Sequence, residues 1–208
     1  MTDRDAVQRG YDGLAETYAA ERSPGDRELS MLEDLLDRLD ADARLLDAGC
    51  GQGEPILARA ADRADATGLD FSGEQLRLAA DSAPGASLLQ GDMTALPFGP
   101  NSFDAVTAFH SLIHVPLSEH GPAIEEFARV LRPGGYLLAS EGPQEWVGSN
   151  PDWLDAGAEM QWSIAGREAT LSDLRSAGFE VLAERTDADE LAEEDDGAWV
   201  FFLARLAG

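Results

Sequence analysis

A glycine-rich segment, residues 47–53 (DAGCGQG), follows a short apolar run and precedes a helical pattern. Glycines in such a turn let the backbone approach a ligand closely, and the free amides of the next helix attract a phosphate or a carboxylate. A dinucleotide site would need G-x-G-x-x-G, whereas these glycines follow G-x-G-x-G. Glu54 would also repel a pyrophosphate. The segment therefore predicts a ligand-binding loop that differs from a dinucleotide site.

Two aspartates follow the next two predicted strands. Asp70 lies 19 residues beyond Gly51, where a carboxylate can accept both hydroxyls of a ribose. Asp92 could accept from an adenine amino group while the amide of Met93 donates to the ring. The alternatives are an ordinary loop aspartate for Asp70 and a helix cap or turn for Asp92.

Five motifs in order resemble those of class I S-adenosylmethionine-dependent methyltransferases. The likeness spans about residues 10–140 and continues more loosely in the final strands. The motifs are LLDAGCGQG at 45–53, GLDFS at 68–72, GDM to LPF at 91–98, NSFDAV at 101–106 and RVLRPGG at 129–135.

The resemblance implies S-adenosylmethionine as cofactor, S-adenosylhomocysteine as product and a defined set of cofactor-binding residues. In similar enzymes the glycine loop holds the methionine end, and the strand-end carboxylates hold the ribose and the adenine edge. The implied residues are Tyr11, Tyr18, Asp47, Gly49, Cys50, Gly51, Gln52, Gly53, Asp70, Phe71, Gly91, Asp92, Met93 and Phe109.

Some of these residues have particular roles by resemblance. Asp47 orients the glycine loop, Phe71 packs on the adenine, and Phe109 lies near the sulfonium. Tyr11 and Tyr18 match a leader helix that closes over the cofactor, with a place on the apolar stripe of that helix as the alternative.

The three histidines fall within eleven residues after the fourth predicted strand. A hydroxyl or ammonium acceptor must lose a proton, and histidine titrates near neutral pH. His110 is the predicted catalytic base or acceptor-orienting group, with His114 and His120 as further candidates. No metal site is predicted, because His110 and His114 lack a third ligand.

The segment after the fifth predicted strand carries Trp146, Trp153 and Trp162 without a clear periodic pattern. Long loops of this kind are often functional, so these side chains could line an aromatic acceptor pocket. They could equally be apolar plugs over the sheet edge. Glu141 could hold a basic acceptor or cap a turn.

Short apolar runs alternate with helical patterns along the chain. This order predicts an α/β fold: a doubly wound, seven-stranded, mostly parallel sheet of the Rossmann-like methyltransferase type, with an antiparallel last strand and an N-terminal helical cap. The expected helices are 3–22, 26–40, 56–63, 73–82, 118–131 and 169–177, and the expected strands are 44–47, 66–71, 86–90, 103–109, 136–140, 178–182 and 199–206.

We expect one domain over residues 1–208, because 208 residues suit a single core. Its parts are a helical cap (1–41), a cofactor-binding core (42–140) and an acceptor-side loop with C-terminal strands (141–208). An acidic loop is expected at 187–197. The oligomeric state is expected to be a monomer or a dimer.

Composition adds a strong charge imbalance: 40 acidic residues, 15 basic residues that are all arginine, and a net charge of −25. Such a chain lacks the basic footprint of nucleic-acid and membrane-surface binders. The polar N-terminus, with no apolar secretory segment, and the single Cys50 favour a cytoplasmic protein. The acidity fits a high-salt cytoplasm; genome drift is the alternative, although it explains arginine over lysine better than it explains the acids.

The sequence thus predicts methyl transfer from S-adenosylmethionine to a small-molecule acceptor. Alternatives are a protein methyltransferase, a non-catalytic protein that binds S-adenosylmethionine or S-adenosylhomocysteine, and an NAD-dependent oxidoreductase. The glycine spacing argues against the last.

The charge imbalance predicts that stability and activity rise with salt, because added ions screen the repulsion among carboxylates. Urea unfolding at 0.1 M and molar KCl measures the effect, and the free energy of unfolding should be higher at molar KCl. Equal stability at both salt concentrations would favour genome drift.

Overall fold

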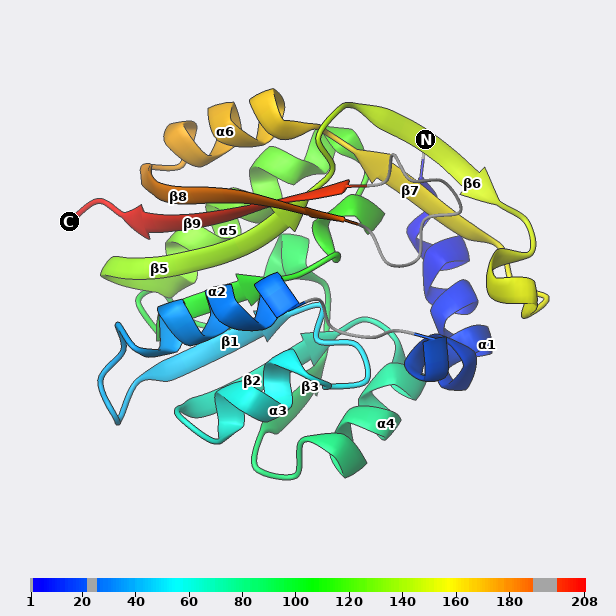
Figure 1. The fold of residues 1–208 in the computed structure, drawn as a ribbon, viewed down its shortest axis with the longest axis horizontal. Helices are drawn as coiled ribbons and strands as arrows, with labels where there is room; N and C mark the ends of the chain where they lie inside the picture. Colours follow the sequence, from blue (N-terminus) through cyan, green and yellow to red (C-terminus); the bar gives the residue numbers. More distant parts are fainter. Residues whose placement is uncertain (1, 22–25, 189–197) are drawn as a thin grey trace.

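The computed structural model describes residues 2–21, 26–188 and 198–208. Its centre is a seven-stranded sheet with the order β3-β2-β1-β4-β5-β9-β8 (Figure 1). The strands are β1 (Arg44–Ala48), β2 (Asp65–Asp70), β3 (Ser87–Gln90), β4 (Phe103–Ala108), β5 (Leu131–Glu141), β8 (Phe179–Ala188) and β9 (Ala198–Leu206).

Strands β1 to β5 pair in parallel, and β9 pairs antiparallel with both β5 and β8. This confirms the predicted α/β sheet and its antiparallel last strand. The order reverses between β1 and β4, so the loops after these two strands diverge and leave a crevice at their carboxyl ends.

Six α-helices accompany the sheet in the described part of the chain. They are α1 (Arg4–Glu21), α2 (Asp26–Leu36), α3 (Ile56–Ala61), α4 (Gly73–Ser82), α5 (His120–Val130) and α6 (Arg167–Ser176). None of these helices is both long and apolar enough to cross a membrane.

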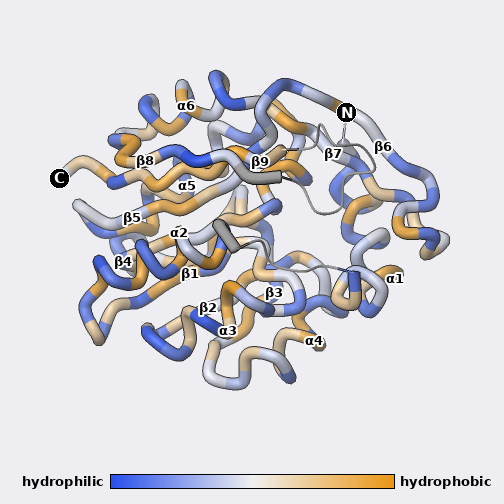
Figure 2. Tube along the Cα trace, in the orientation of Figure 1, coloured by the Kyte–Doolittle hydropathy of each residue, from blue (hydrophilic) through white to orange (hydrophobic). Residues whose placement is uncertain are grey.

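Neighbouring residues of each central strand point into two different cores, because side chains alternate across a strand. Leu45 packs with α2 and α3, whereas Leu46 packs with α5 and α6. Phe201 and Phe202 of β9 divide in the same way. Figure 2 shows the resulting hydrophobic strands at the centre of the trace, and helices cover both faces as a doubly wound sheet requires.

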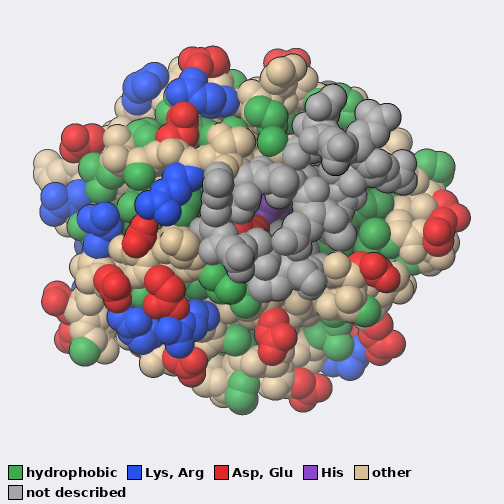
Figure 3. All heavy atoms as spheres, viewed as in Figure 1, with side chains coloured by type: hydrophobic (Ala, Val, Ile, Leu, Met, Phe, Trp, Pro, Cys, Tyr) green, Lys and Arg blue, Asp and Glu red, His purple; other side chains and the backbone are tan. Residues whose placement is uncertain are grey.

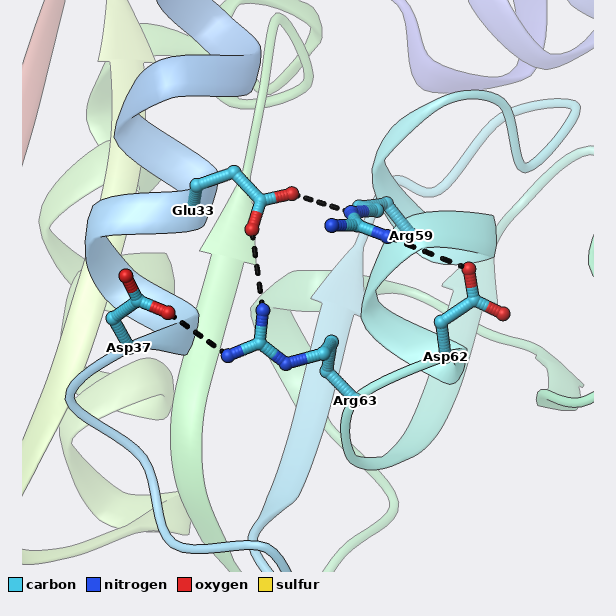
Figure 4. A network of polar contacts seen from close by, with 5 residues as sticks. All are labelled: Glu33, Asp37, Arg59, Asp62 and Arg63. Atoms are coloured by element: carbon cyan, nitrogen blue, oxygen red, sulfur yellow. Dashed lines mark hydrogen bonds and ion pairs between the residues drawn. The ribbon is translucent and has the colours of Figure 1, made fainter.

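An ion-pair network joins α2 to α3 on the surface (Figure 4). Glu33 accepts from Arg59 and Arg63, and Arg63 also reaches Asp37 at 2.9 Å. All four side chains are at least one-third exposed, so salt screens the network and its contribution to stability is small.

The largest departure from expectation lies between residues 141 and 165, where no regular pattern was predicted. The chain forms a two-stranded antiparallel sheet of β6 (Trp146–Asn150) and β7 (Met160–Ile164), joined through a short 3₁₀ turn (Trp153–Asp155). Alternation of Met160, Trp162 and Ile164 with polar residues was the signal for a strand.

Several element ends also differ from expectation. The second helix ends at Leu36, four residues before the expected end, and α5 starts at His120 after a separate 3₁₀ turn. Strand β5 begins at Leu131 and includes the RPGG segment, around which the register with β4 shifts. Strand β8 extends to Ala188, so 187–188 are strand, and the rest of the predicted acidic loop lies outside the described residues.

Helix α1 and the β6–β7 sheet lie together at the end of the main sheet where the parallel strands finish (Figure 1). Val7, Tyr11 and Leu14 of α1 form a small core with Met160. Gln8 donates to the carbonyl of Phe71 at 2.7 Å, and Ser72 donates to Asp12 at 2.6 Å. The predicted helical cap is therefore tied to the second strand's loop and to the β6–β7 sheet.

Two glycines of α1 give a matched test of this docking. A Cβ on Gly10 would lie 2.5 Å from the carbonyl oxygen of Glu159, whereas a Cβ on Gly13 would lie 3.8 Å from the nearest atom, the Cβ of Ala158. Gly10→Ala should lower the free energy of unfolding by about 1–3 kcal/mol, since the backbone must move. Gly13→Ala should raise it by about 0.5–1 kcal/mol through helix propensity.

Urea unfolding of both variants checks this pair. A Gly10→Ala protein that is as stable as Gly13→Ala would show that α1 does not pack on β7 as described.

Candidate functional site

The glycine loop after β1 adopts a left-handed backbone conformation that residues with a Cβ rarely adopt. Gly49, Gly51 and Gly53 have φ values of +81°, +53° and +89°. A Cβ on Gly49 would lie 2.2 Å from the Cβ of Ser111, so the loop also touches the chain after β4. The amide of Gly49 donates to the carbonyl of Leu69 at 2.7 Å, which fixes the loop to the end of β2.

Two buried carboxylates lie at the start of this loop and beside it. Asp70 accepts from the amides of Gly51 and Ser72 at 2.8 and 2.9 Å, and Asp47 accepts from the Thr107 hydroxyl at 2.7 Å. Burial raises the pKa of Asp70 to about 6 and that of Asp47 to about 7. Each raised pKa makes folding less favourable as the pH rises from 4 through 6 or 7. Hydroxyl donors to the ionised Asp70 would offset that cost.

Two pockets flank the loop. The strand-end pocket, of about 670 Å³, lies over the ends of β1, β2 and β3. The glycine-loop pocket, of about 480 Å³, lies on the other side, between the loop and α2. The predicted cofactor residues in the first are Tyr11, Tyr18, Gly49, Gly51, Asp70, Phe71, Gly91, Asp92, Met93 and Phe109. Those in the second are Tyr18, Asp47, Gly49, Cys50, Gly51, Gln52 and Phe109.

Gly53 lines neither pocket. A Cβ there would lie 2.8 Å from the Ser82 hydroxyl and 3.2 Å from the Cα of Ala79, so this glycine allows α4 to pack closely on the loop. Cys50 is buried, and burial raises the pKa of its thiol.

Asp92 has two structural partners in addition to its place in the strand-end pocket. It accepts from the amide of Thr94 at 2.8 Å, so the predicted alternative of a helix cap is present. Its other oxygen accepts from Arg4 of α1 at 2.5 Å. Arg4 also pairs with Glu119, so the start of the cap is held across the pocket.

A third cavity, the tryptophan pocket of about 650 Å³, lies beside the strand-end pocket. It is lined by Tyr11, Tyr18, His110, Ile113, His114, Trp146, Trp153, Trp162, Ile164 and Trp199. Tyr18 and His110 line all three cavities. These two residues mark the place where the three cavities meet.

His110 has an unusual backbone, with a φ of +50°. Its amide donates to the Ser140 hydroxyl at 2.7 Å, and its ring packs edge-on against Trp199 at 4.5 Å. Its Nε2 is hydrogen-bonded to the buried carboxylate of Glu28 from α2. Because a carboxylate accepts, Nε2 carries a proton, and in the neutral form of the ring the lone pair lies on Nδ1.

His114 lies in the wall between the strand-end and tryptophan pockets. Its Nδ1 donates to the carbonyl of Gln161 at 3.0 Å, so the Tyr11 hydroxyl donates to its Nε2 at 2.8 Å. Burial lowers the pKa of His114 to about 4, so the ring is neutral at physiological pH.

The remaining candidates lie apart from the three cavities. His120 donates from Nε2 to the carbonyl of Val115 at 2.9 Å, and its Nδ1 lies 3.4 Å from the fully buried Glu141. Glu141 accepts from the amide of Gly142 at 2.9 Å, as a turn cap would. Within the described ranges, no group of three or more histidine, cysteine or acidic residues could hold a metal.

Sequence reasoning missed Gln75, Glu28 and Arg4. Gln75 is 1% exposed and lines the strand-end pocket, and both its amide oxygen and nitrogen lack hydrogen-bond partners among the described residues. Buried polar groups nearly always have partners, so this amide fits a ligand with polar groups of its own, such as an adenine-ribose moiety. In the sequence, the only signal for Gln75 was its place in the first turn of α4, five residues after Asp70.

The fold and the strand-end pocket are typical of a nucleoside-binding α/β enzyme, and a further cavity lies beside that pocket. The sequence model of the methyltransferase domain matches residues 46–139. A relative, 27-O-demethylrifamycin SV methyltransferase of Amycolatopsis mediterranei, is 32% identical over 97% of this chain and 82% of its own. Methyltransferase GfsG of Streptomyces halstedii is 38% identical over 66% of this chain, which spans about half of that relative (51%).

Solved structures agree on the fold. N-methyltransferase NodS of Bradyrhizobium japonicum, in complex with S-adenosylhomocysteine, has a TM-score of 0.73 at 16% identity, covering 98% of this chain and 99% of its own. The [4+2]-cyclase SpnF has a TM-score of 0.72 at 27% identity, with coverage of 99% and 96%. The chain therefore belongs to the class I S-adenosylmethionine-dependent methyltransferase family, and its cofactor is S-adenosylmethionine.

The pKa of Asp70 predicts a pH dependence of cofactor binding. We expect ribose hydroxyls to donate to the ionised carboxylate, so at pH 5 binding must first remove a proton from a group whose pKa is about 6. The affinity for S-adenosylhomocysteine should therefore rise about tenfold from pH 5 to pH 8 and level off above pH 7.

Calorimetry of S-adenosylhomocysteine binding to two variants separates the effect of the Asp70 charge from that of the Gln75 contact. Asp70→Asn should weaken binding at pH 8 by more than tenfold, through loss of charge-assisted hydrogen bonds of about 1.5–3 kcal/mol, and should flatten this part of the pH profile. Gln75→Leu should weaken binding by a similar factor at every pH. An Asp70→Asn protein with wild-type affinity and slope would remove Asp70 from the site.

Proposed function

We propose that the chain transfers the methyl group of S-adenosylmethionine to a small-molecule acceptor in the tryptophan pocket, at the point marked by Tyr18 and His110. The observation that carries this assignment is that these two side chains line all three cavities. A cofactor that spans the strand-end and glycine-loop pockets must pass them, and an acceptor in the tryptophan pocket must reach them.

Each cofactor pocket has a defined part in this proposal. Asp70 and Gln75 hold the ribose side, and Phe71, Asp92 and Met93 enclose the adenine. The glycine loop receives the methionine end, with Asp47 beneath it. Phe109 and the two tyrosines close the site around the reacting centre, since α1 is docked across it.

The bound cofactor supplies a methyl group on a positively charged sulfur, which an acceptor displaces in line. The protein's own contribution is alignment and exclusion of water by the docked α1 and the aromatic walls. His110 accepts the acceptor's proton at Nδ1, and Glu28 positions the ring through Nε2. His114 is held by Tyr11 and Gln161, so it fixes the wall and the tyrosine.

The relatives support a small acceptor, since their names include enzymes of rifamycin, menaquinone and fatty-acid methylation. For this chain we propose a free small molecule, and neither nucleic acid nor a membrane surface, as its partner. We also propose a salt-rich cytoplasm as its surroundings. The surface that Figure 3 displays carries acidic groups scattered over the view and arginines mainly over its left half. The whole sequence has a net charge of −25.

The proposal treats residues 1–208 as one unit. The cap (1–41) and the core (42–140) supply walls of all three cavities, and the acceptor-side part (141–208) supplies walls of the tryptophan pocket. The cap alone provides Tyr11, Tyr18 and Glu28, so it is an integral part of the site.

Substitution of His110 tests the proposed chemistry. Asparagine tolerates the left-handed backbone, so His110→Asn keeps the φ of +50° while removing the base. With an acceptor found by S-adenosylhomocysteine release, kcat should fall by about 10²- to 10⁴-fold while the affinity for S-adenosylhomocysteine stays within a few-fold.

Glu28→Gln keeps a hydrogen-bonding group at Nε2 and should shift the pH profile of kcat with a smaller loss of rate. His120→Gln serves as a comparison outside the cavities. Equal rates for His110→Asn and the wild type would dismiss His110 as the base, and an absence of S-adenosylhomocysteine release with any acceptor would contradict methyl transfer.

A further inference from the structure

All four tryptophans of the chain line the same cavity. Trp146 comes from β6, Trp153 from the 3₁₀ turn, Trp162 from β7 and Trp199 from the start of β9. Elements separated by more than thirty residues thus bring every indole of the protein to one place. The sequence had suggested only the first three as possible pocket walls.

The rings form two groups of contacts. In one group, the rings of Trp153 and Trp162 meet edge to face with their centroids 5.3 Å apart, and the Trp146 ring lies 6.1 Å from that of Trp162. In the other group, the Trp199 ring packs edge-on against His110, with centroids 4.5 Å apart. A Cβ on Gly148 would lie 2.3 Å from the Trp146 ring, so this indole lies flat over the strand and extends the wall to the mouth of the cavity, where it is half exposed.

The described lining of this pocket contains no carboxylate and no arginine. Its polar atoms are two tyrosine hydroxyls, two histidine rings and the indole N–H groups. Burial keeps His114 neutral by lowering its pKa to about 4, and the same desolvation opposes any other cation there. A cationic acceptor would also lie beside the positive sulfonium, and an anionic one would meet no arginine among the described lining residues.

We infer that the acceptor is an uncharged, flat, ring-bearing molecule that lies against the tryptophan walls and presents a hydroxyl to His110. This inference rests on the proposed methyl transfer. Aromatic walls gain most from a flat π-surface, through stacked and edge-to-face contacts.

A hydroxyl acceptor gives a step in which charge and electrons balance. A lone pair of the hydroxyl oxygen forms a bond to the methyl carbon, and the carbon–sulfur pair returns to sulfur, which becomes a neutral thioether. The hydroxyl proton moves to Nδ1 of His110. One positive charge is present before and after the step, so His110 acquires charge as the sulfonium loses it.

Calorimetry with four probes in the presence of S-adenosylhomocysteine tests the inference. 2-Naphthol should bind at least tenfold more tightly than decahydro-2-naphthol, which has the same skeleton without the π-system. The affinity for 2-naphthol should exceed the affinities for 2-naphthylmethylammonium and 2-naphthoate by a similar factor. Trp162→Leu should remove most of the preference for the flat ring.

Phe98→Leu is the matched control, since Phe98 packs on Phe103 and lies outside the lining of the tryptophan pocket. Equal or tighter binding of the saturated or charged probes, or no binding by any probe, would overturn the acceptor class. In that case, release of S-adenosylhomocysteine in the presence of some other acceptor would leave the proposed function standing. Loss of all release would contradict the methyl transfer itself.

Discussion

The site depends on the buried carboxylate of Asp70, which receives the amides of Gly51 and Ser72 together. One side chain thereby fixes the glycine loop after β1 and the start of α4 after β2. The Ser72 side chain then reaches Asp12, and the Phe71 carbonyl accepts from Gln8, so the position of the cap follows from the same contact. A burial that raises the pKa of Asp70 to about 6 shows that this arrangement is kept at a cost in solvation. A ligand that donates to the carboxylate would offset that cost.

The core was predictable because its sequence obeys one rule throughout. Adjacent apolar residues such as Leu45–Leu46 and Phe201–Phe202 serve both faces of a covered sheet, and glycines mark the turn that enters the site. Most predicted cofactor residues line the strand-end or glycine-loop pocket, because they lie next to strand ends and the topology alone collects them. Gly53 is the exception, since its small size serves the packing of α4.

The acceptor side was less predictable because its contacts join distant segments. The pairing of β6 with β7 involves only five residues in each strand, and Glu28 meets His110 across 82 positions. Nothing local to Glu28 distinguishes it from the other acids of a surface helix. Gln75 was missed for a related reason, since a glutamine in an amphipathic helix is expected to face solvent, whereas this side chain is buried.

His110 combines a strained backbone, a buried carboxylate partner and contact with all three cavities. Strain of this kind persists only where surrounding structure holds it, and here the Ser140 hydroxyl and Trp199 do so. The three cavities thus share this fixed side chain, together with Tyr18. We propose that the cofactor's methyl group and the acceptor meet beside these two residues.

The most direct test of this account is a structure of the complex with S-adenosylhomocysteine. We expect the ribose on Asp70 and Gln75, the homocysteine end in the glycine-loop pocket, and the sulfur beside Tyr18 and His110, facing the tryptophan pocket. A sulfur that faces solvent, or a nucleoside bound away from Asp70, would contradict the central claim that the three cavities meet at the point of methyl transfer.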